Sequence, residues 1–126
     1  MKRFAIAPAI LAGLAAAGCA STPQEQLEDI QARALAACPA AIERSENAGE
    51  YGYTLETCEC IAGRITTPLW SDADSAYTGA PMAVEDARLI AGAISKAPTL
   101  TKGLEDAEPK MSTPAANSIN TCYAKY

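Results

Sequence analysis

The sequence contains no histidine. This excludes catalytic triads of the Ser-His-Asp kind, Cys-His nucleophile pairs and every metal site that needs an imidazole ligand. The glycines also form none of the patterns that bind phosphate groups. We therefore expect a chain that is not an enzyme and that has no cofactor and no bound metal.

Aromatic residues are scarce, at 6 %, with one Trp and one Phe among 126 residues. A small domain with so few large side chains buries little apolar surface and must build its core mostly from Ala, Leu and Ile. No segment of useful length alternates between apolar and polar residues, whereas apolar residues recur at three- and four-residue steps. This periodicity predicts an all-α fold, a small three- to four-helix bundle.

The N-terminus has the three parts of a secretory signal peptide. Lys2 and Arg3 form a basic start, residues 4–17 form an apolar run, and the run ends in small residues. A run of about 14 residues is too short to cross a bilayer comfortably. We therefore predict that the chain is exported rather than held by a transmembrane helix.

Ala16-Ala17-Gly18-Cys19 closes this run. The segment resembles the lipobox of bacterial lipoproteins, in which a cysteine follows a branched aliphatic and two small residues, although Ala16 stands where Leu is usual. The resemblance implies cleavage after Gly18 and lipidation of Cys19, including a further chain such as palmitate, because one acyl chain alone binds a membrane only marginally. The residue after the cysteine is Ala20 and not Asp. This resembles the pattern of lipoproteins that are routed to the outer membrane, where they face the periplasm.

Ordinary signal-peptide cleavage after Ala20 is the alternative, and it would give a soluble periplasmic or secreted protein. Both modes of cleavage remove Cys19 from disulfide pairing. In the lipoprotein interpretation the chain divides into a signal peptide (1–18), a lipidated cysteine with its tether (19–24) and a helical domain (25–126).

The predicted mature chain is acidic. Loss of Lys2 and Arg3 leaves 10 − 2 = 8 basic residues against 15 acidic ones, a net charge of −7. Such a balance argues against binding to nucleic acid or to anionic lipid head groups. The membrane contact that we expect is therefore the lipid anchor alone.

Four cysteines remain for pairing: Cys38, Cys58, Cys60 and Cys122. An even number in an exported domain indicates two disulfides, with three possible pairings. Residues two apart on a helix leave it on nearly opposite sides, so Cys58 and Cys60 should reach different partners. We favour Cys38–Cys58 and Cys60–Cys122, with the swapped pairing as the main alternative.

Helical periodicity covers four segments, about 25–46, 54–69, 82–97 and 113 onward. Pro39 should kink the first segment or split it at Cys38. Pro68 should shorten the second segment. Residues 99–113 are expected to be mostly irregular, with one turn near 104–108.

Other candidate sites are weaker. Asp72 and Asp74 begin like a calcium loop, but alanine occupies the third ligand position, so a solvated loop is expected. Glu56 and Glu59 with Arg64 are expected to form a solvated helix face. Aromatic residues in or near loops favour binding surfaces. This group comprises Tyr51, Tyr53, Trp70 and Tyr77.

The cysteine arrangement, with one in the first helix, a Cys-x-Cys in the second and one near the C-terminus, resembles that of small exported proteins of unknown function from proteobacteria. That resemblance implies no activity. Our leading hypothesis is a non-enzymatic envelope lipoprotein that presents a small helical domain to a protein partner, as an envelope component, inhibitor, immunity or exclusion factor. The alternative is a thiol-redox or soft-metal-handling protein that uses Cys58 and Cys60.

Overall fold

A computed structural model describes most of the predicted mature chain. The described residues are 21–71, 76–77 and 79–125. The predicted cleavage position after Gly18, the lipidation residue Cys19, and Asp72 and Asp74 lie outside these ranges.

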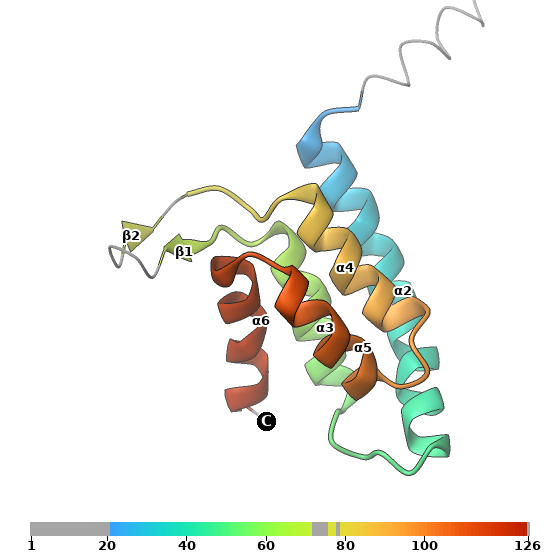
Figure 1. Cartoon of the computed structure of the whole chain (residues 1–126). Helices are drawn as coiled ribbons and strands as arrows, with labels where there is room; N and C mark the ends of the chain where they lie inside the picture. Colours follow the sequence, from blue (N-terminus) through green and yellow to red (C-terminus); the bar gives the residue numbers. More distant parts are fainter. Residues whose placement is uncertain (1–20, 72–75, 78, 126) are drawn as a thin grey trace, which may run out of the picture.

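The described residues form five α-helices, two short 3₁₀ helices and one antiparallel ribbon of two strands (Figure 1). Each strand has only two residues, so the all-α prediction is confirmed, as are the two disulfides that staple the bundle. The elements in chain order are α2 (Pro23–Asn47), α3 (Leu55–Gly63), η1 (Arg64–Thr66), β1 (Trp70–Ser71), β2 (Ala76–Tyr77), α4 (Val84–Ser95), α5 (Leu100–Ala107), η2 (Glu108–Lys110) and α6 (Thr113–Lys125).

Helix α2 is one continuous helix that contains Pro39, so of the two outcomes expected of this proline the split at Cys38 is wrong. Its start is well defined, because the Thr22 hydroxyl accepts from the backbone N–H of Glu25 while the Glu25 carboxylate accepts from that of Thr22. Pro39 removes one backbone hydrogen bond, to the carbonyl of Leu35. Both residues lie on the exposed side of α2, where water can replace the missing donor.

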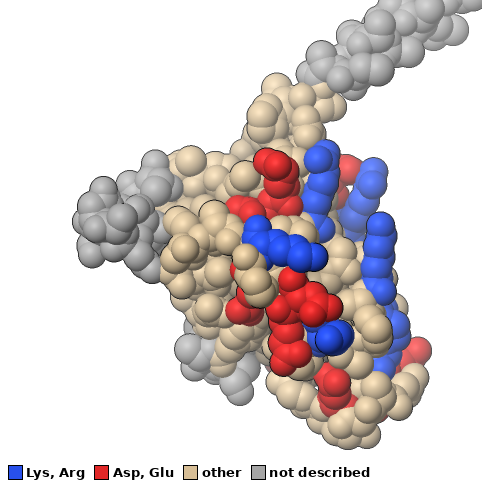
Figure 2. All heavy atoms as spheres, in the orientation of Figure 1, with Lys and Arg blue, Asp and Glu red and all other residues tan. Residues whose placement is uncertain are grey.

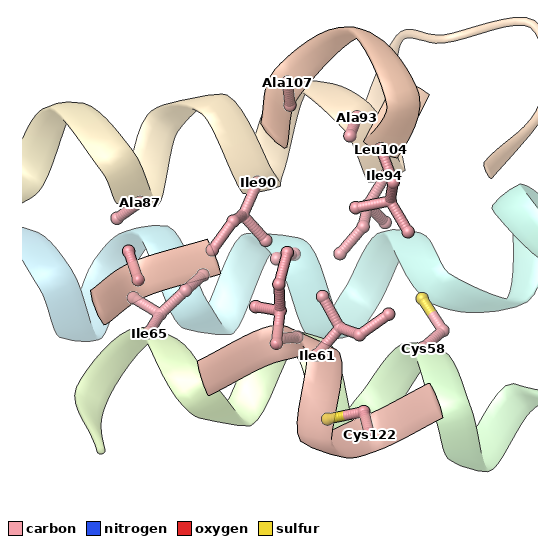
Figure 3. Packing of buried hydrophobic residues seen from close by; sticks show 14 of the residues in the cluster. Cys58, Ile61, Ile65, Ala87, Ile90, Ala93, Ile94, Leu104, Ala107 and Cys122 are labelled. Carbon is pink, nitrogen blue, oxygen red and sulfur yellow. The ribbon is translucent and has the colours of Figure 1, made fainter. Parts of the chain in front are cut away.

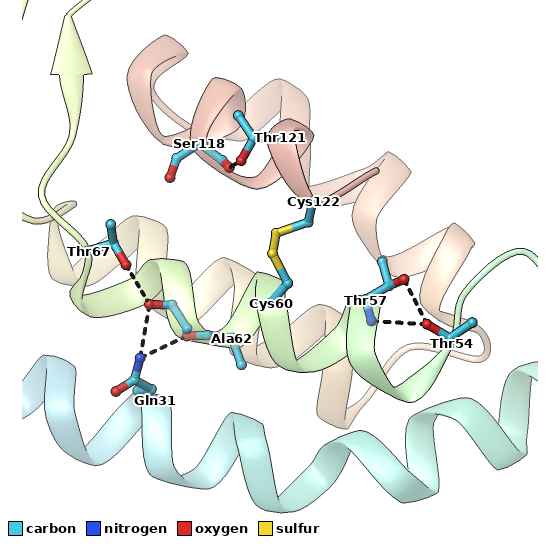
Figure 4. The surroundings of a disulfide bond; sticks show 10 residues. Gln31, Thr54, Thr57, Cys60, Ala62, Thr67, Ser118, Thr121 and Cys122 are labelled. Atoms are coloured by element: carbon cyan, nitrogen blue, oxygen red, sulfur yellow. Dashed lines mark hydrogen bonds between the residues drawn. A yellow bond between two sulfur atoms is a disulfide. The ribbon is translucent and has the colours of Figure 1, made fainter. Parts of the chain in front are cut away.

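Helix α3 begins at the predicted cap, because the Thr54 hydroxyl accepts from the backbone N–H of Thr57 at 3.1 Å. The helix continues as η1 and ends at Thr66, ahead of Pro68. The end of α3 is held from α2 by Gln31, whose side-chain amide donates to the carbonyls of residues 62 and 63 (Figure 4). These bonds satisfy backbone carbonyls that a helix end leaves without donors.

Helix α5 lies where the sequence analysis expects an irregular segment. Thr99 caps it by accepting from the backbone N–H of Lys102, and Leu100 and Leu104 are buried on one face. An eight-residue helix that contains Gly103 is marginal by itself. Its packing against α4 stabilises the helix. The periodicity of the local sequence cannot reveal such a tertiary contact.

The core lies between α2, α4 and α3, with α5 packed on α4 and α6 packed on α3 (Figure 3). Buried alanines on α2 and α4, such as Ala34 and Ala87, allow these helices to approach closely. The expectation of a core built from Ala, Leu and Ile is confirmed. Its largest fully buried aliphatic side chains are Leu27, Ile61, Ile65, Ile90, Ile94, Leu100, Leu104 and Ile119.

The bundle has two distinct ends. Helix α2 begins at the upper end in Figure 1, close to the start of α4. The loop of residues 48–54 and the C-terminal end of α6 lie at the opposite end. We refer to this opposite end, which carries Tyr51, Tyr53 and Tyr123, as the tyrosine end.

Candidate functional site

The four predicted disulfide cysteines are paired as favoured. Cys38 on α2 bonds Cys58 on α3, and Cys60 on α3 bonds Cys122 on α6, each with 5.8 Å between the Cα atoms. Figure 4 shows the second bridge between the two facing helices. Cys58 and Cys60 therefore leave α3 toward different helices, as the helical geometry of a Cys-x-Cys requires.

The pairing leaves both cysteines of the Cys-x-Cys without a free thiol. Cys58 is fully buried, and Cys60 is half-buried beside its buried partner Cys122. Soft-metal binding through Cys58 and Cys60 would require both bridges to open, because the thiolate is the metal ligand. Among the described residues, no three Cys, Asp or Glu side chains are grouped so that they could hold a metal ion.

The carboxylates near the Cys-x-Cys do not form an acid site with Arg64. Glu56 and Glu59 are exposed. Neither forms an ion pair with Arg64 in the described part of the chain, where the ion pairs are Arg33–Asp29 and Lys102–Asp106. The solvated helix face expected for these glutamates is thus what the structure shows.

The tyrosine end contains a hollow of about 300 Å³. Tyr53, just before α3, and Tyr123, on α6, meet edge to face there, with ring centroids 5.7 Å apart and ring planes at 64°. The other described residues that line it are Gly52, Thr57 and Thr101, so the loop, α3, α5 and α6 all contribute. The hollow, which we call the tyrosine pocket, offers ring surfaces and hydroxyl groups.

Two exposed apolar side chains are close to Tyr53 in the chain. Tyr51 is 73 % exposed and Leu55 is 41 % exposed, on either side of Tyr53 in the chain. Trp70 and Tyr77, which the sequence analysis places in the same aromatic group, instead pair through their backbones in the β1–β2 ribbon. The predicted aromatic surface therefore separates into two places.

Tyr123 is not among the candidate residues of the sequence analysis, because its four-residue spacing from Ile119 is that of an ordinary apolar helix face. The signal that could have found it is the favoured pairing of Cys60 with Cys122. That bridge holds the end of α6 against α3 and brings the residue after Cys122 toward the start of α3.

The surroundings of the two phenols favour their neutral forms. Burial, followed by the nearby Tyr53 and Glu108, raises the pKa of Tyr123, whose hydroxyl donates to the Glu108 carboxylate at 3.2 Å. Burial also raises the pKa of Tyr53, and the negative charges of Glu108 and Glu105 raise it further. At neutral pH the pocket therefore presents phenol groups, not phenolates.

We expect Tyr53 and Tyr123 to resist ionisation in the folded protein. The raised pKa of each phenol means that the folded state holds the proton more tightly than the unfolded chain does. Ionisation of the two tyrosines therefore leaves the free energy of unfolding unchanged below pH 10.0, the ordinary tyrosine pKa, and lowers it above that pH. The loss continues as the pH rises through the folded-state pKa. Absorbance of tyrosinate, followed against pH for the folded protein and for the protein in denaturant, measures the difference.

Two variants assign this delayed ionisation. Tyr53→Phe and Tyr123→Phe should each remove one phenol of raised pKa from the titration of the folded protein. In denaturant, each variant should differ from the parent protein only by the loss of one ordinary tyrosine. Folded and unfolded curves that coincide for the parent protein would show that the pocket does not protect its phenols.

The outer surface carries charges of both signs. On the face shown in Figure 2, acidic and basic side chains are intermingled over α4 and α5, and neither sign covers this face alone. In the part of the chain that the structure describes, no helix combines the length with the hydropathy that crossing a bilayer requires.

Comparison with known proteins finds no family model, no curated protein and no solved structure that matches this chain.

Proposed function

We propose that this chain is the precursor of an envelope lipoprotein whose mature part is a non-enzymatic binding module. The observation that carries the proposal is the tyrosine pocket, together with the exposed Tyr51 and Leu55 close to Tyr53 in the chain. Tyrosine is enriched at protein–protein interfaces because it offers a large apolar surface together with a hydrogen-bonding group. The partner is accordingly a protein of the envelope, or a foreign protein in an inhibitor, immunity or exclusion role.

The position of α2 supports a placement in which the tyrosine end points away from the membrane. Its cap, Thr22, follows the proposed lipidation residue Cys19 by three positions, and three extended residues span at most about 10 Å. A helix of 25 residues is about 37 Å long. An anchor at Cys19 would thus keep the start of α2 near the lipid surface and hold the tyrosine end away from it.

The anchor is tested by the intact mass of the mature protein from native membranes. We expect the mass of residues 19–126 plus acyl chains, lighter than the reduced form by four hydrogen atoms because of the two disulfides. Outer-membrane fractions should contain the protein. A lipid-free chain that begins at Ser21 would contradict the lipoprotein assignment and indicate a soluble exported protein.

Photo-crosslinking in intact cells tests the partner-binding surface. A benzophenone amino acid in place of Tyr51 should form a specific adduct with one envelope protein, because this side chain is exposed at the tyrosine end. The matched control places the same group at Ala32, an exposed residue of α2. Adding Leu55→Ala to the Tyr51 probe should reduce the adduct several-fold. Equal adducts from both positions, or none from either, would contradict the proposal.

A further inference from the structure

A second hollow lies between helix α6 and the segment that begins with η1 and continues to Leu69, and it shares no lining residue with the tyrosine pocket. Its volume is about 370 Å³. Figure 4 shows Thr67 on one side and Ser118 and Thr121 on the other, and the Cys60–Cys122 bridge that joins α3 to α6. The described residues that line it are Arg64, Thr67, Pro68, Leu69, Pro114, Asn117, Ser118 and Thr121. We call it the Arg64 pocket.

Arg64 is the one cation among these lining residues, and part of its guanidinium has no partner. Its Nε atom is buried and makes no hydrogen bond. By contrast, the half-buried Arg44 donates through Nε to the carbonyl of Ala97 at 3.0 Å and through Nη2 to that of Ile94 at 2.7 Å. Because this Nε is out of reach of water, the guanidinium has lost part of its hydration, and an anionic ligand that pairs with the rest of the group in the Arg64 pocket would offset this cost.

The hydroxyl groups of the pocket complement the guanidinium. Thr67 donates its hydroxyl proton to the carbonyl of Gly63 at 2.9 Å, and Thr121 donates to that of Ser118 at 2.7 Å. The Ser118 side chain also lines the pocket. The pocket therefore combines a guanidinium with hydroxyl groups from both of its sides.

We propose that the Arg64 pocket binds the carboxylate of a ligand that carries a small apolar group next to it. The planar guanidinium matches a carboxylate with two parallel hydrogen bonds. One lining cation balances one negative charge, whereas a phosphate monoester carries about −1.5 to −2 and would leave excess charge within an acidic protein. Pro68, Leu69 and Pro114 supply apolar contacts for the neighbouring group.

This proposal is independent of the tyrosine end and of the lipid anchor. The test uses the mature protein in detergent, labelled with ¹⁵N and with both disulfides intact. N-acetyl-L-alanine is the probe, and N-acetyl-L-alaninamide, which lacks the charge, is the matched neutral control. Binding of the probe should shift the Arg64 Nε–H resonance directly, and the neutral control should bind at least tenfold more weakly.

Variants at Arg64 extend the test. Arg64→Gln should weaken binding of the probe at least tenfold, and Arg64→Lys should restore part of the affinity. Arg33→Gln, at an exposed arginine paired with Asp29 on the surface of α2, should leave it unchanged. Propionate distinguishes a free carboxylic acid from a peptide C-terminus: equal affinities support the former, and tighter binding of N-acetyl-L-alanine supports the latter.

Three results would overturn the carboxylate assignment. The first is equal binding of the neutral amide, which would show that charge has no role. The second is inorganic phosphate binding in preference to both carboxylates. The third is an Arg64 Nε–H resonance that does not move while other resonances shift, which would place the binding site elsewhere.

Discussion

Replacing Cys60 and Cys122 together by alanine should lower the free energy of unfolding by about 4 kcal/mol, because the lost bridge closes a long loop in the unfolded chain. The two residues are 62 positions apart. In the chain-entropy model the effect of a cross-link grows with the logarithm of that separation. Alanine avoids leaving a buried serine hydroxyl at position 122 without a partner, since Cys122 is fully buried.

The matched control is the double variant Cys38→Ala with Cys58→Ala, whose bridge closes a loop of 20 residues. The shorter loop should cost about 3 kcal/mol. Each loss is comparable to the entire stability of a small domain, so both variants should be largely unfolded at growth temperature. Urea unfolding at equilibrium measures the two values.

Unchanged stability of the Cys60/Cys122 variant would show that this bridge does not constrain the unfolded chain. A larger loss from the short loop than from the long one would show that lost native packing outweighs chain entropy. The comparison is informative because Cys38 and Cys58 both lie in the core.

Gly103→Ala should destabilise the protein by about 2 kcal/mol, because an added methyl group would overpack the contact between α5 and α4. A Cβ atom at Gly103 would lie 2.7 Å from the carbonyl oxygen of Ala93, 2.7 Å from the Cβ of Ala97 and 2.8 Å from the Cα of Ala93. Two of these three atoms belong to the backbone of α4. The two helices must therefore move apart.

Gly92→Ala is the matched control, because it makes the same change in α4 at a position that faces open space. No atom outside its own helix lies within 4 Å of a Cβ built at Gly92. Alanine lowers the flexibility of the unfolded chain, so this variant should gain about 0.5–1 kcal/mol. Thermal unfolding should thus show shifts of opposite sign. A neutral or stabilising Gly103→Ala would mean that α5 is not held closely against α4.

Local rules were sufficient for much of the bundle. Thr54 caps α3, Pro68 lies beyond its end, and Cys58 and Cys60 diverge, all as helix geometry predicts. These local rules failed to predict helix boundaries where solvent exposure or tertiary packing decides whether a helix forms. Pro39 lies within α2 because its face is exposed, and α5 forms around Gly103 because α4 covers it.

The candidate sites depended more strongly on the tertiary structure. Tyr51 and Tyr53 could be identified as candidates from their loop, but the pairing of Tyr53 with Tyr123 requires α6 to lie against α3. The sequence analysis placed Arg64 with Glu56 and Glu59 on a solvated helix face. The tertiary structure instead makes Arg64 part of the lining of a pocket to which α6 contributes, with its Nε buried and without an acceptor.

The sequence by itself determined the helical fold class, the divergence of Cys58 and Cys60 and a core of Ala, Leu and Ile, because helix periodicity and side-chain direction are local properties. Of the three possible disulfide pairings it could only favour one, because the choice depends on how the helices pack. The tertiary structure alone decided that α2 continues through Pro39, that α5 exists, and which polar groups lie in pockets. Burial depends on contacts between residues far apart in the chain, and it is burial that leaves the Arg64 Nε without water and keeps the protons on Tyr53 and Tyr123.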